Sequence, residues 1–264
     1  MDETRVNQAA TLLSAGRLEN AKLGPLPDGL RPRDEREAYI VQDALHERFV
    51  AAGLGVVGGY KIGCTTEVMQ RFLGIPNPCA GAVFESTAHR SEGTFRHGGL
   101  VRPGVECEIA VRLNADLASD GAPYDRESVA PAVGAFMAAI ELVDDRWSDY
   151  KSVDTATLIA DDFFGAGCVL GQEVTDWRAL DPRDITGSMS INGEVVGTGV
   201  GGDIMGHPLE ALAWLANLKA ELGAVLRAGE FVLLGSIVET QWVDQGDTVT
   251  IELDGLGRAT ARFV

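Results

Sequence analysis

The stretch Gly104-Val105-Glu106-Cys107-Glu108-Ile109-Ala110-Val111 places two carboxylates in an otherwise apolar run. In a β-strand, side chains two residues apart point to the same face, so Glu106 and Glu108 stand side by side. Like charges at that spacing repel unless a cation, a shared proton or water relieves them. The stretch therefore predicts either a cation site or the wet face of an amphipathic strand.

A third carboxylate, Glu141, lies in the middle of a second apolar run, residues 138–143. A lone glutamate there would be costly to desolvate. Mg²⁺ and Mn²⁺ prefer carboxylate and water ligands, and three carboxylates would leave positions open for a substrate. We therefore expect Glu106, Glu108 and Glu141 to bind Mg²⁺ or Mn²⁺.

Composition limits the class of protein. The chain has 264 residues, is 45% hydrophobic, and can build one sizeable core with a small appended domain. Its formal net charge is −17 and it shows no Lys/Arg cluster, so nucleic acid is a poor candidate partner. The acidity would also repel a small anionic substrate, which then needs a local cation at its site.

The chain has no apolar run long enough to span a membrane, and its first residues lack the order of a signal peptide. Four cysteines are widely scattered, without the CxxC spacing of a zinc or redox site. We therefore expect a cytoplasmic protein with reduced, buried thiols and no membrane partner.

The order of patterns predicts an α+β protein. Apolar residues at helical spacing predict helices over residues 6–17 and 34–52, which would form an N-terminal helical cap over residues 1–55. Residues 56–264 would form a mixed-β metal-binding domain, a roll or barrel. Its strands are expected at 56–64, 105–113, 136–143, 185–191, 231–234, 248–253 and 258–264, with a hairpin at Asn192-Gly193 and a helix over 208–222.

Several motifs occur in the order seen in one known family. They are Gly59-Tyr60-Lys61-Ile62-Gly63-Cys64-Thr65-Thr66, Leu73-Gly74, the two glutamate-bearing runs, Asp144-Asp145-Arg146, Ile159-Ala160-Asp161-Asp162, Gly206-His207-Pro208-Leu209, Leu226-Arg227-Ala228-Gly229-Glu230, Gly246-Asp247 and Leu256-Gly257. Together they resemble the group of 2-oxopent-4-enoate hydratases and 4-oxalocrotonate decarboxylases in the fumarylacetoacetate hydrolase superfamily.

This resemblance implies that Glu106, Glu108 and Glu141 hold the metal and that the substrate is a 2-hydroxy-dienoate or 2-oxo-4-enoate whose 2-oxo acid head chelates it. A bound metal would stabilise the enolate formed as a proton moves along the conjugated chain. The implied activity is a hydratase of aromatic catabolism that works as a homo-oligomer. A 2-oxo-3-enoate decarboxylase, an acylpyruvate-type C–C hydrolase and a non-catalytic partner subunit are the alternatives.

Lys61 is the first candidate catalytic residue. On the family analogy it faces the metal and serves proton transfer or the developing negative charge. Its neighbours are small or apolar, so burial would depress its pKa while nearby carboxylates would keep it charged. The alternative is a lysine that reaches out of a strand to water.

The loop at residues 75–81 departs from the hydratase pattern, because Cys79 stands where hydratases carry an aspartate implicated in the proton chemistry. A thiol of ordinary pKa is a weaker acid–base partner. Glu85 or His89, just downstream, could act as the base instead, or each could be an ordinary polar loop residue.

A second departure lies in Asp161-Asp162-Phe163-Phe164, where hydratases tend to have Asn and small or hydroxyl residues. If this segment lines the pocket, Asp162 and Phe164 would contact the substrate, and the rings would suit a larger, flatter or less polar tail. The rings could equally be core packing. Arg146 could pair with a second substrate carboxylate, unless the neighbouring aspartates neutralise it.

Overall fold

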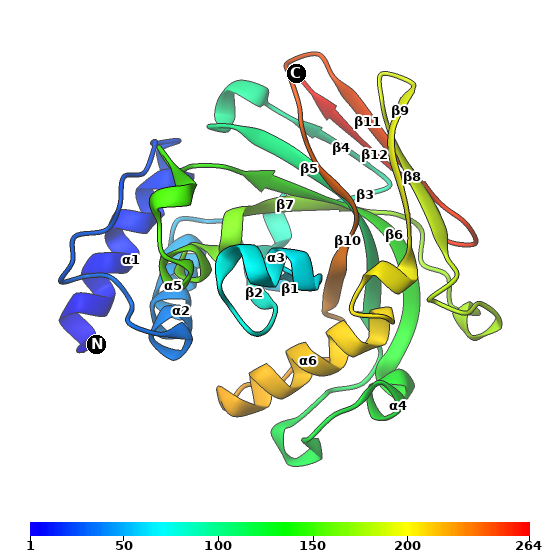
Figure 1. Cartoon of the computed structure of the whole chain (residues 1–264), viewed down its shortest axis with the longest axis horizontal. Coiled ribbons are helices and arrows are strands. Elements are labelled where there is room, and N and C mark those ends of the chain that lie inside the picture. Colours follow the sequence, from blue (N-terminus) through cyan, green and yellow to red (C-terminus); the bar gives the residue numbers. More distant parts are fainter.

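The computed structural model describes residues 1–264, apart from the side chains of residues 72 and 73. Leu73 of the family motif therefore has a side chain outside the described set. Helices α1 (Glu3–Leu18) and α2 (Glu35–Ala51) pack together at one end of the molecule (Figure 1). Each begins at an aspartate whose carboxylate accepts a backbone N–H of the first turn, Asp2 from Arg5 and Asp34 from Glu37. The two predicted N-terminal helices are confirmed.

The strands form one mixed sheet. They are β1 (Val57–Gly63), β2 (Cys79–Phe84), β3 (Ala88–Arg90), β4 (Glu92–Phe95), β5 (Pro103–Leu113), β6 (Val133–Asp144), β7 (Gly165–Leu170), β8 (Thr186–Ile191), β9 (Glu194–Val200), β10 (Phe231–Trp242), β11 (Thr248–Leu253) and β12 (Gly257–Phe263). Their spatial order is β2-β1-β10-β5-β6-β7-β3-β4-β12-β11-β8-β9.

The sheet curls back on itself, so that β8 and β9 contact β10 although they stand far from it in the strand order. In the described chain the end strands β2 and β9 do not pair with each other. Of the two predicted architectures, a roll and a barrel, the fold is therefore the α+β roll. The predicted hairpin joins β8 to β9, with Asn192 and Gly193 both at positive φ.

The two faces of strand β5 have different partners. Val105, Cys107 and Ile109 point into the main core of the molecule. Ala110, on the other face, belongs to a smaller apolar cluster with Met137, Leu233 and others. Glu106 and Glu108 share the face of Ala110, because side chains alternate along a strand. The small cluster therefore ends where the carboxylates begin.

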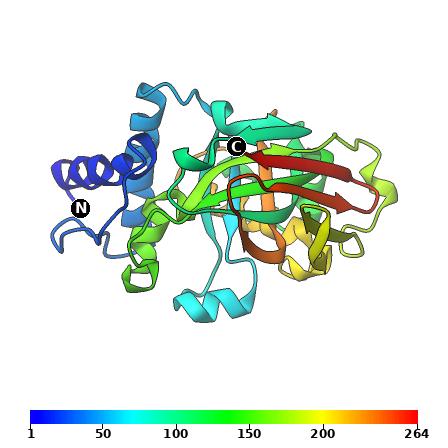
Figure 2. The ribbon, with the colours of Figure 1, turned by 90° about the horizontal axis from the view of Figure 1, so that it is seen from above.

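The remaining α-helices are α3 (Glu67–Leu73), α4 (Arg126–Val129), α5 (Thr155–Ala160) and α6 (Pro208–Glu221). Helix α6, predicted from its leucine spacing, packs against β10. Helix α3 stands out from the body of the protein (Figure 2). No helix in the described part of the chain is both long and apolar enough to cross a membrane.

The helical end is joined to the sheet by buried polar contacts. Gln42 of α2 donates from Nε2 to the carbonyls of Ala80 on β2 and Ile159 on α5, at 2.9 and 2.7 Å. The division into a cap over 1–55 and a domain over 56–264 stays a prediction.

Candidate metal centre and active site

Three carboxylates meet on neighbouring strands. Glu106 of β5 and Glu141 of β6 are register partners, and Glu108 follows two residues further along the same face. Each can offer one carboxylate oxygen such that these atoms all lie within 4.8 Å of one another. Register and side-chain alternation alone bring the trio together.

The carboxylates are mostly withdrawn from water. Glu108 and Glu141 are 0% and 1% exposed, and Glu106 is half-buried. The backbone N–H of Gly235 donates to Glu108 Oε2 at 2.6 Å, and the Thr240 hydroxyl donates to Glu106 Oε1. Glu108 Oε1 and Glu141 Oε2 have no hydrogen-bond donor, and Glu141 Oε1 is paired with the Lys61 ammonium. Buried carboxylate oxygens without donors suit a cation.

Burial and mutual repulsion raise the pKa values of two of these acids. Burial, then the charges of Glu141 and Glu106, raises the pKa of Glu108 well above its usual range. Burial raises the pKa of Glu141 to about 7, although the Lys61 ammonium acts in the opposite direction. Protons therefore relieve the repulsion when no ion is bound. Three clustered oxygen donors of this kind fit Mg²⁺ or Mn²⁺.

Lys61 of β1 lies beside the trio. Its Nζ is 3.1 Å from Glu141 Oε1 and donates a 2.6 Å hydrogen bond to the carbonyl of Phe163. The side chain is 3% exposed, so it does not reach out to water. Burial disfavours the ammonium, but the charges of Glu141 and Glu106 outweigh burial and raise the pKa of Lys61.

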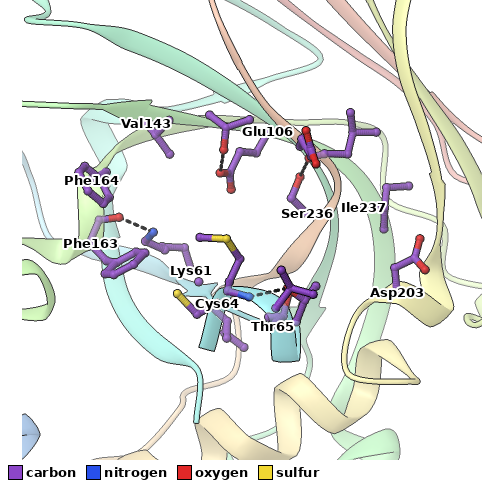
Figure 3. A pocket seen from close by; sticks show the side chains of 18 of the residues that line it. Lys61, Cys64, Thr65, Glu106, Val143, Phe163, Phe164, Asp203, Ser236 and Ile237 are labelled. Atoms are coloured by element: carbon purple, nitrogen blue, oxygen red, sulfur yellow. Dashed lines mark hydrogen bonds between the residues drawn. The ribbon is translucent and has the colours of Figure 1, made fainter. Parts of the chain in front are cut away.

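A cavity of about 650 Å³ opens in front of Lys61 and Glu106 (Figure 3). Tyr150, Phe164 and Trp242 are among its apolar and aromatic lining residues. Lys61 is the one cation among the described lining residues, whereas Glu106, Asp203 and Glu239 are acidic. The cavity can therefore hold a small molecule whose charged end lies near Lys61.

Of the predicted substrate contacts, Phe164 lines this cavity, whereas Asp162 and Arg146 do not belong to the described lining. Asp162 is fully buried behind the wall, with Oδ1 2.6 Å from His46 Nε2. Arg146 is buried too, and its guanidinium pairs with Asp161 at 3.1 Å. Both groups therefore have partners within the protein.

The three further catalytic candidates also lie outside the described lining. Cys79 is buried with its Sγ 3.9 Å from that of Cys64, and burial followed by the contact with Cys64 raises the pKa of its thiol. Glu85 is exposed on the turn after β2, and His89 packs edge-on against Phe95, at 4.9 Å between ring centroids. Catalytic roles for Cys79, Glu85 and His89 stay predictions.

Sequence reasoning missed the contribution of β10. Ser236 and Thr240 line the cavity, and Gly235 supplies the donor for Glu108. The predicted strand ends at Leu234, because Gly235 interrupts the apolar run, whereas the strand in the structure continues to Trp242. Breaks in register on either side of Ser236 mark an irregular strand at this point.

An α+β roll with a buried carboxylate trio beside a lysine defines a distinct class of site. The family model for the fumarylacetoacetate (FAA) hydrolase C-terminal domain matches residues 83–264. The chain belongs to this family.

Its relatives carry two activities in their names. The chain is 33% identical to a 2-keto-4-pentenoate hydratase of Paraburkholderia phymatum, over 99% of this chain and 98% of the relative. It is 31% identical to a 4-oxalocrotonate decarboxylase of Pseudomonas putida, over 98% of each. A solved 4-oxalocrotonate decarboxylase from Pseudomonas putida G7, complexed with magnesium and adipate, superimposes with a TM-score of 0.93 at 28% identity, covering 100% of this chain and 99% of that one.

Proposed function

We propose that this protein is a divalent-metal-dependent lyase that adds water to a 2-hydroxy-dienoate or 2-oxo-4-enoate in the breakdown of an aromatic compound. The hydratase relatives of nearly equal length support the reaction class. The observation that carries the proposal is the trio of Glu106, Glu108 and Glu141 beside a small-molecule cavity, because buried oxygens of Glu108 and Glu141 lack a donor.

In this proposal the three glutamates hold Mg²⁺ or Mn²⁺, which supplies Lewis-acid stabilisation of the substrate's enolate. Lys61 provides the second positive charge of the site, and its ammonium is within reach of both Glu141 and the cavity. We assign Lys61 to proton transfer or to the negative charge that develops on the substrate. The apolar walls limit the access of water to that charge.

The cavity lining favours a substrate with an uncharged tail. A dicarboxylate such as 4-oxalocrotonate would bring a second carboxylate into the cavity, where Asp203 and Glu239 are acidic and Lys61 is the one described cation. Arg102 stacks on Trp242 at 4.0 Å from the ring centroid, but Asp145 neutralises it at 3.3 Å. Tyr150 and Phe164 instead offer apolar surface to a tail.

Decarboxylation is the second candidate, because a solved decarboxylase matches the whole chain with a TM-score of 0.93. Stabilisation of an enolate serves loss of carbon dioxide as well as addition of water. The carboxylate trio is therefore compatible with both reactions. The acidic and apolar lining of the cavity is the feature that favours the hydratase substrate over a dicarboxylate.

The experiment compares 2-hydroxypenta-2,4-dienoate with 4-oxalocrotonate, each with Mg²⁺ or Mn²⁺. Dienol absorbance follows hydration, and release of carbon dioxide follows decarboxylation. We expect metal-dependent hydration of the monocarboxylate that a chelator and Glu106→Gln both abolish. Faster loss of carbon dioxide from the dicarboxylate would select the second candidate, and turnover that survives the chelator would overturn the metal mechanism.

The proposal also includes a cytoplasmic location and a homo-oligomer. The cytoplasmic location is supported by the four cysteines, which are all free and buried. Light scattering of the purified protein tests the oligomer, and a single-chain mass would contradict it.

A further inference from the structure

The turn at residues 162–164 has a backbone that its residues rarely adopt. Asp162, Phe163 and Phe164 have φ values of 56°, 45° and 65°. Bulky residues at positive φ are genuine outliers, and a run of three persists only where the surroundings hold it in place. The turn follows α5 and leads directly into β7.

The middle residue of this turn is the hydrogen-bond partner of Lys61. The carbonyl of Phe163 accepts from Lys61 Nζ at 2.6 Å, and the Phe163 ring centroid lies 5.1 Å from the same nitrogen (Figure 3). Glu141 and Phe163 thus hold the ammonium from two directions. The Phe163 carbonyl is therefore one of the two groups that orient the Lys61 ammonium.

Asp162 is the residue through which the turn is held. Its Oδ1 accepts from the backbone N–H of Ala82 at 3.0 Å and from His46 Nε2 at 2.6 Å. Its Oδ2 lies 3.6 Å from the guanidinium of Arg17. Ala82 belongs to β2, His46 to α2 and Arg17 to α1, so the anchor joins the helical end of the molecule to the turn.

The residues on both sides of the turn have further anchors. Arg146 donates to the carbonyls of Asp161 and Gly165 at 3.1 and 3.2 Å, and Arg17 also donates to Gly165. Loss of the His46 contact would therefore leave the flanks of the turn in place. The change in conformation would affect Asp162 and the carbonyl of Phe163.

We propose that His46 and Asp162 are positioning residues that fix the Phe163 carbonyl and thereby orient Lys61 in the active site. The proposal rests on the role of Lys61 in the proposed function. Neither His46 nor Asp162 belongs to the described cavity lining, so they act through the turn and not on the substrate. The N-terminal helices thereby take part in the geometry of the site.

The test compares His46→Leu, which removes the hydrogen bond, with His46→Gln, which can restore a donor. His97→Leu is the matched control, since His97 is also half-buried but contacts the carbonyl of Val243 instead. For His46→Leu we expect kcat to fall at least about tenfold, because small displacements of a catalytic group are costly. KM and the dissociation constant for Mg²⁺ should stay within about twofold, and His46→Gln should regain most of kcat.

A readout independent of turnover separates this inference from the proposed reaction. The ¹⁵Nζ resonance of Lys61, assigned by its loss in Lys61→Met, should be visible in the wild type because its protons exchange slowly when buried and hydrogen-bonded. It should shift or vanish in His46→Leu and in Asp162→Ala, which removes the acceptor of both hydrogen bonds, and return in His46→Gln. An unchanged Lys61 resonance in folded His46→Leu would overturn the positioning role, whether or not the dienoate is the substrate.

If His46→Leu does not fold, Asp162→Ala, which removes the acceptor of both hydrogen bonds, carries the test, with thermal unfolding of each variant as a check. A resonance and kcat unchanged in folded Asp162→Ala would contradict the proposal. Equal losses of kcat and of Mg²⁺ affinity would do so too, because they would indicate a general structural defect.

Discussion

Glu106 and Glu141 lie directly opposite each other in the antiparallel pair of β5 and β6. Like charges in this arrangement destabilise a sheet, and here the two stand on a face that is largely closed to water. The pair therefore carries an electrostatic cost that a proton on Glu141 and the Lys61 ammonium reduce, and that a divalent cation would remove. The predictions below follow from that relationship and from the contacts around it.

Replacing any of the three glutamates by glutamine should weaken Mg²⁺ binding at least about tenfold, because loss of even a supporting contact to a metal ligand has that effect. Titration calorimetry of Glu106→Gln, Glu108→Gln and Glu141→Gln measures it. Glu239→Gln is the control, since it removes an acid of the same cavity outside the trio. A loss of affinity as large in Glu239→Gln would refute the assignment of the ligands.

The metal-free protein should lose stability as the pH rises. The pKa of Glu141 is raised to about 7 from 4.5, so the folded state keeps this proton to higher pH than the unfolded state does. Its stabilising contribution is full below about pH 4.5 and is lost by about pH 7, which amounts to roughly 3 kcal/mol.

Urea unfolding between pH 4.5 and 8, with and without Mg²⁺, measures this effect. Glu141→Gln should flatten the metal-free profile, and Mg²⁺ should restore stability above pH 7 in the wild type. A wild-type profile identical to that of Glu141→Gln would show that Glu141 does not titrate in this range.

Gly235→Ala should destabilise the protein and disturb the metal site. Gly235 has a φ of 138°, and an added Cβ would lie 2.6 Å from Thr65 Oγ1. The backbone N–H of Gly235 also donates a hydrogen bond to Glu108. We expect a loss of about 1–3 kcal/mol in the free energy of unfolding, together with weaker Mg²⁺ binding. Gly24→Ala, where a Cβ meets nothing within 4 Å, should have little effect in the same measurements.

A cation introduced into the cavity should change the preference for the substrate tail. Asp203→Lys replaces an exposed acid of the lining by a base. We expect kcat/KM for a dicarboxylate to rise about tenfold relative to the monocarboxylate, a discrimination typical of one pocket contact. Glu194→Lys makes the same change of charge in the distant β8–β9 hairpin and should leave the ratio unaltered. An equal response in both variants would indicate a bulk charge effect.

The predictable part of this site is the part built on regular strands. Alternation places Glu106 and Glu108 on one face, and the position of Glu141 within an apolar run marks a buried acid. The sequence does not state which residues of β5 and β6 pair, because register depends on the whole sheet. The apolar run around Glu141 and the family resemblance both predict it as a third ligand, and the structure places it opposite Glu106.

The conformation of residues outside the regular strands could not be predicted from the sequence. Three non-glycine residues at positive φ, Asp162 to Phe164, carry no local signal for that conformation. The sequence predicts a substrate contact for Asp162 if its segment lines the pocket, whereas the structure buries it against His46, 116 residues earlier in the chain. Such a contact depends on how α2 packs against α5, and no motif spacing encodes it.

The residues that line the cavity come from two kinds of segment, central strands and outer connecting segments. The carboxylates belong to long central strands, whereas Val68 and Met69 lie on the projecting helix α3 and Tyr150 lies on a short connecting turn. Substitutions or insertions in these outer segments would change the lining of the cavity without altering the strands that carry the three glutamates. One scaffold can thus acquire new substrates by remodelling its rim, which makes α3 and the 150–152 turn the first places to engineer.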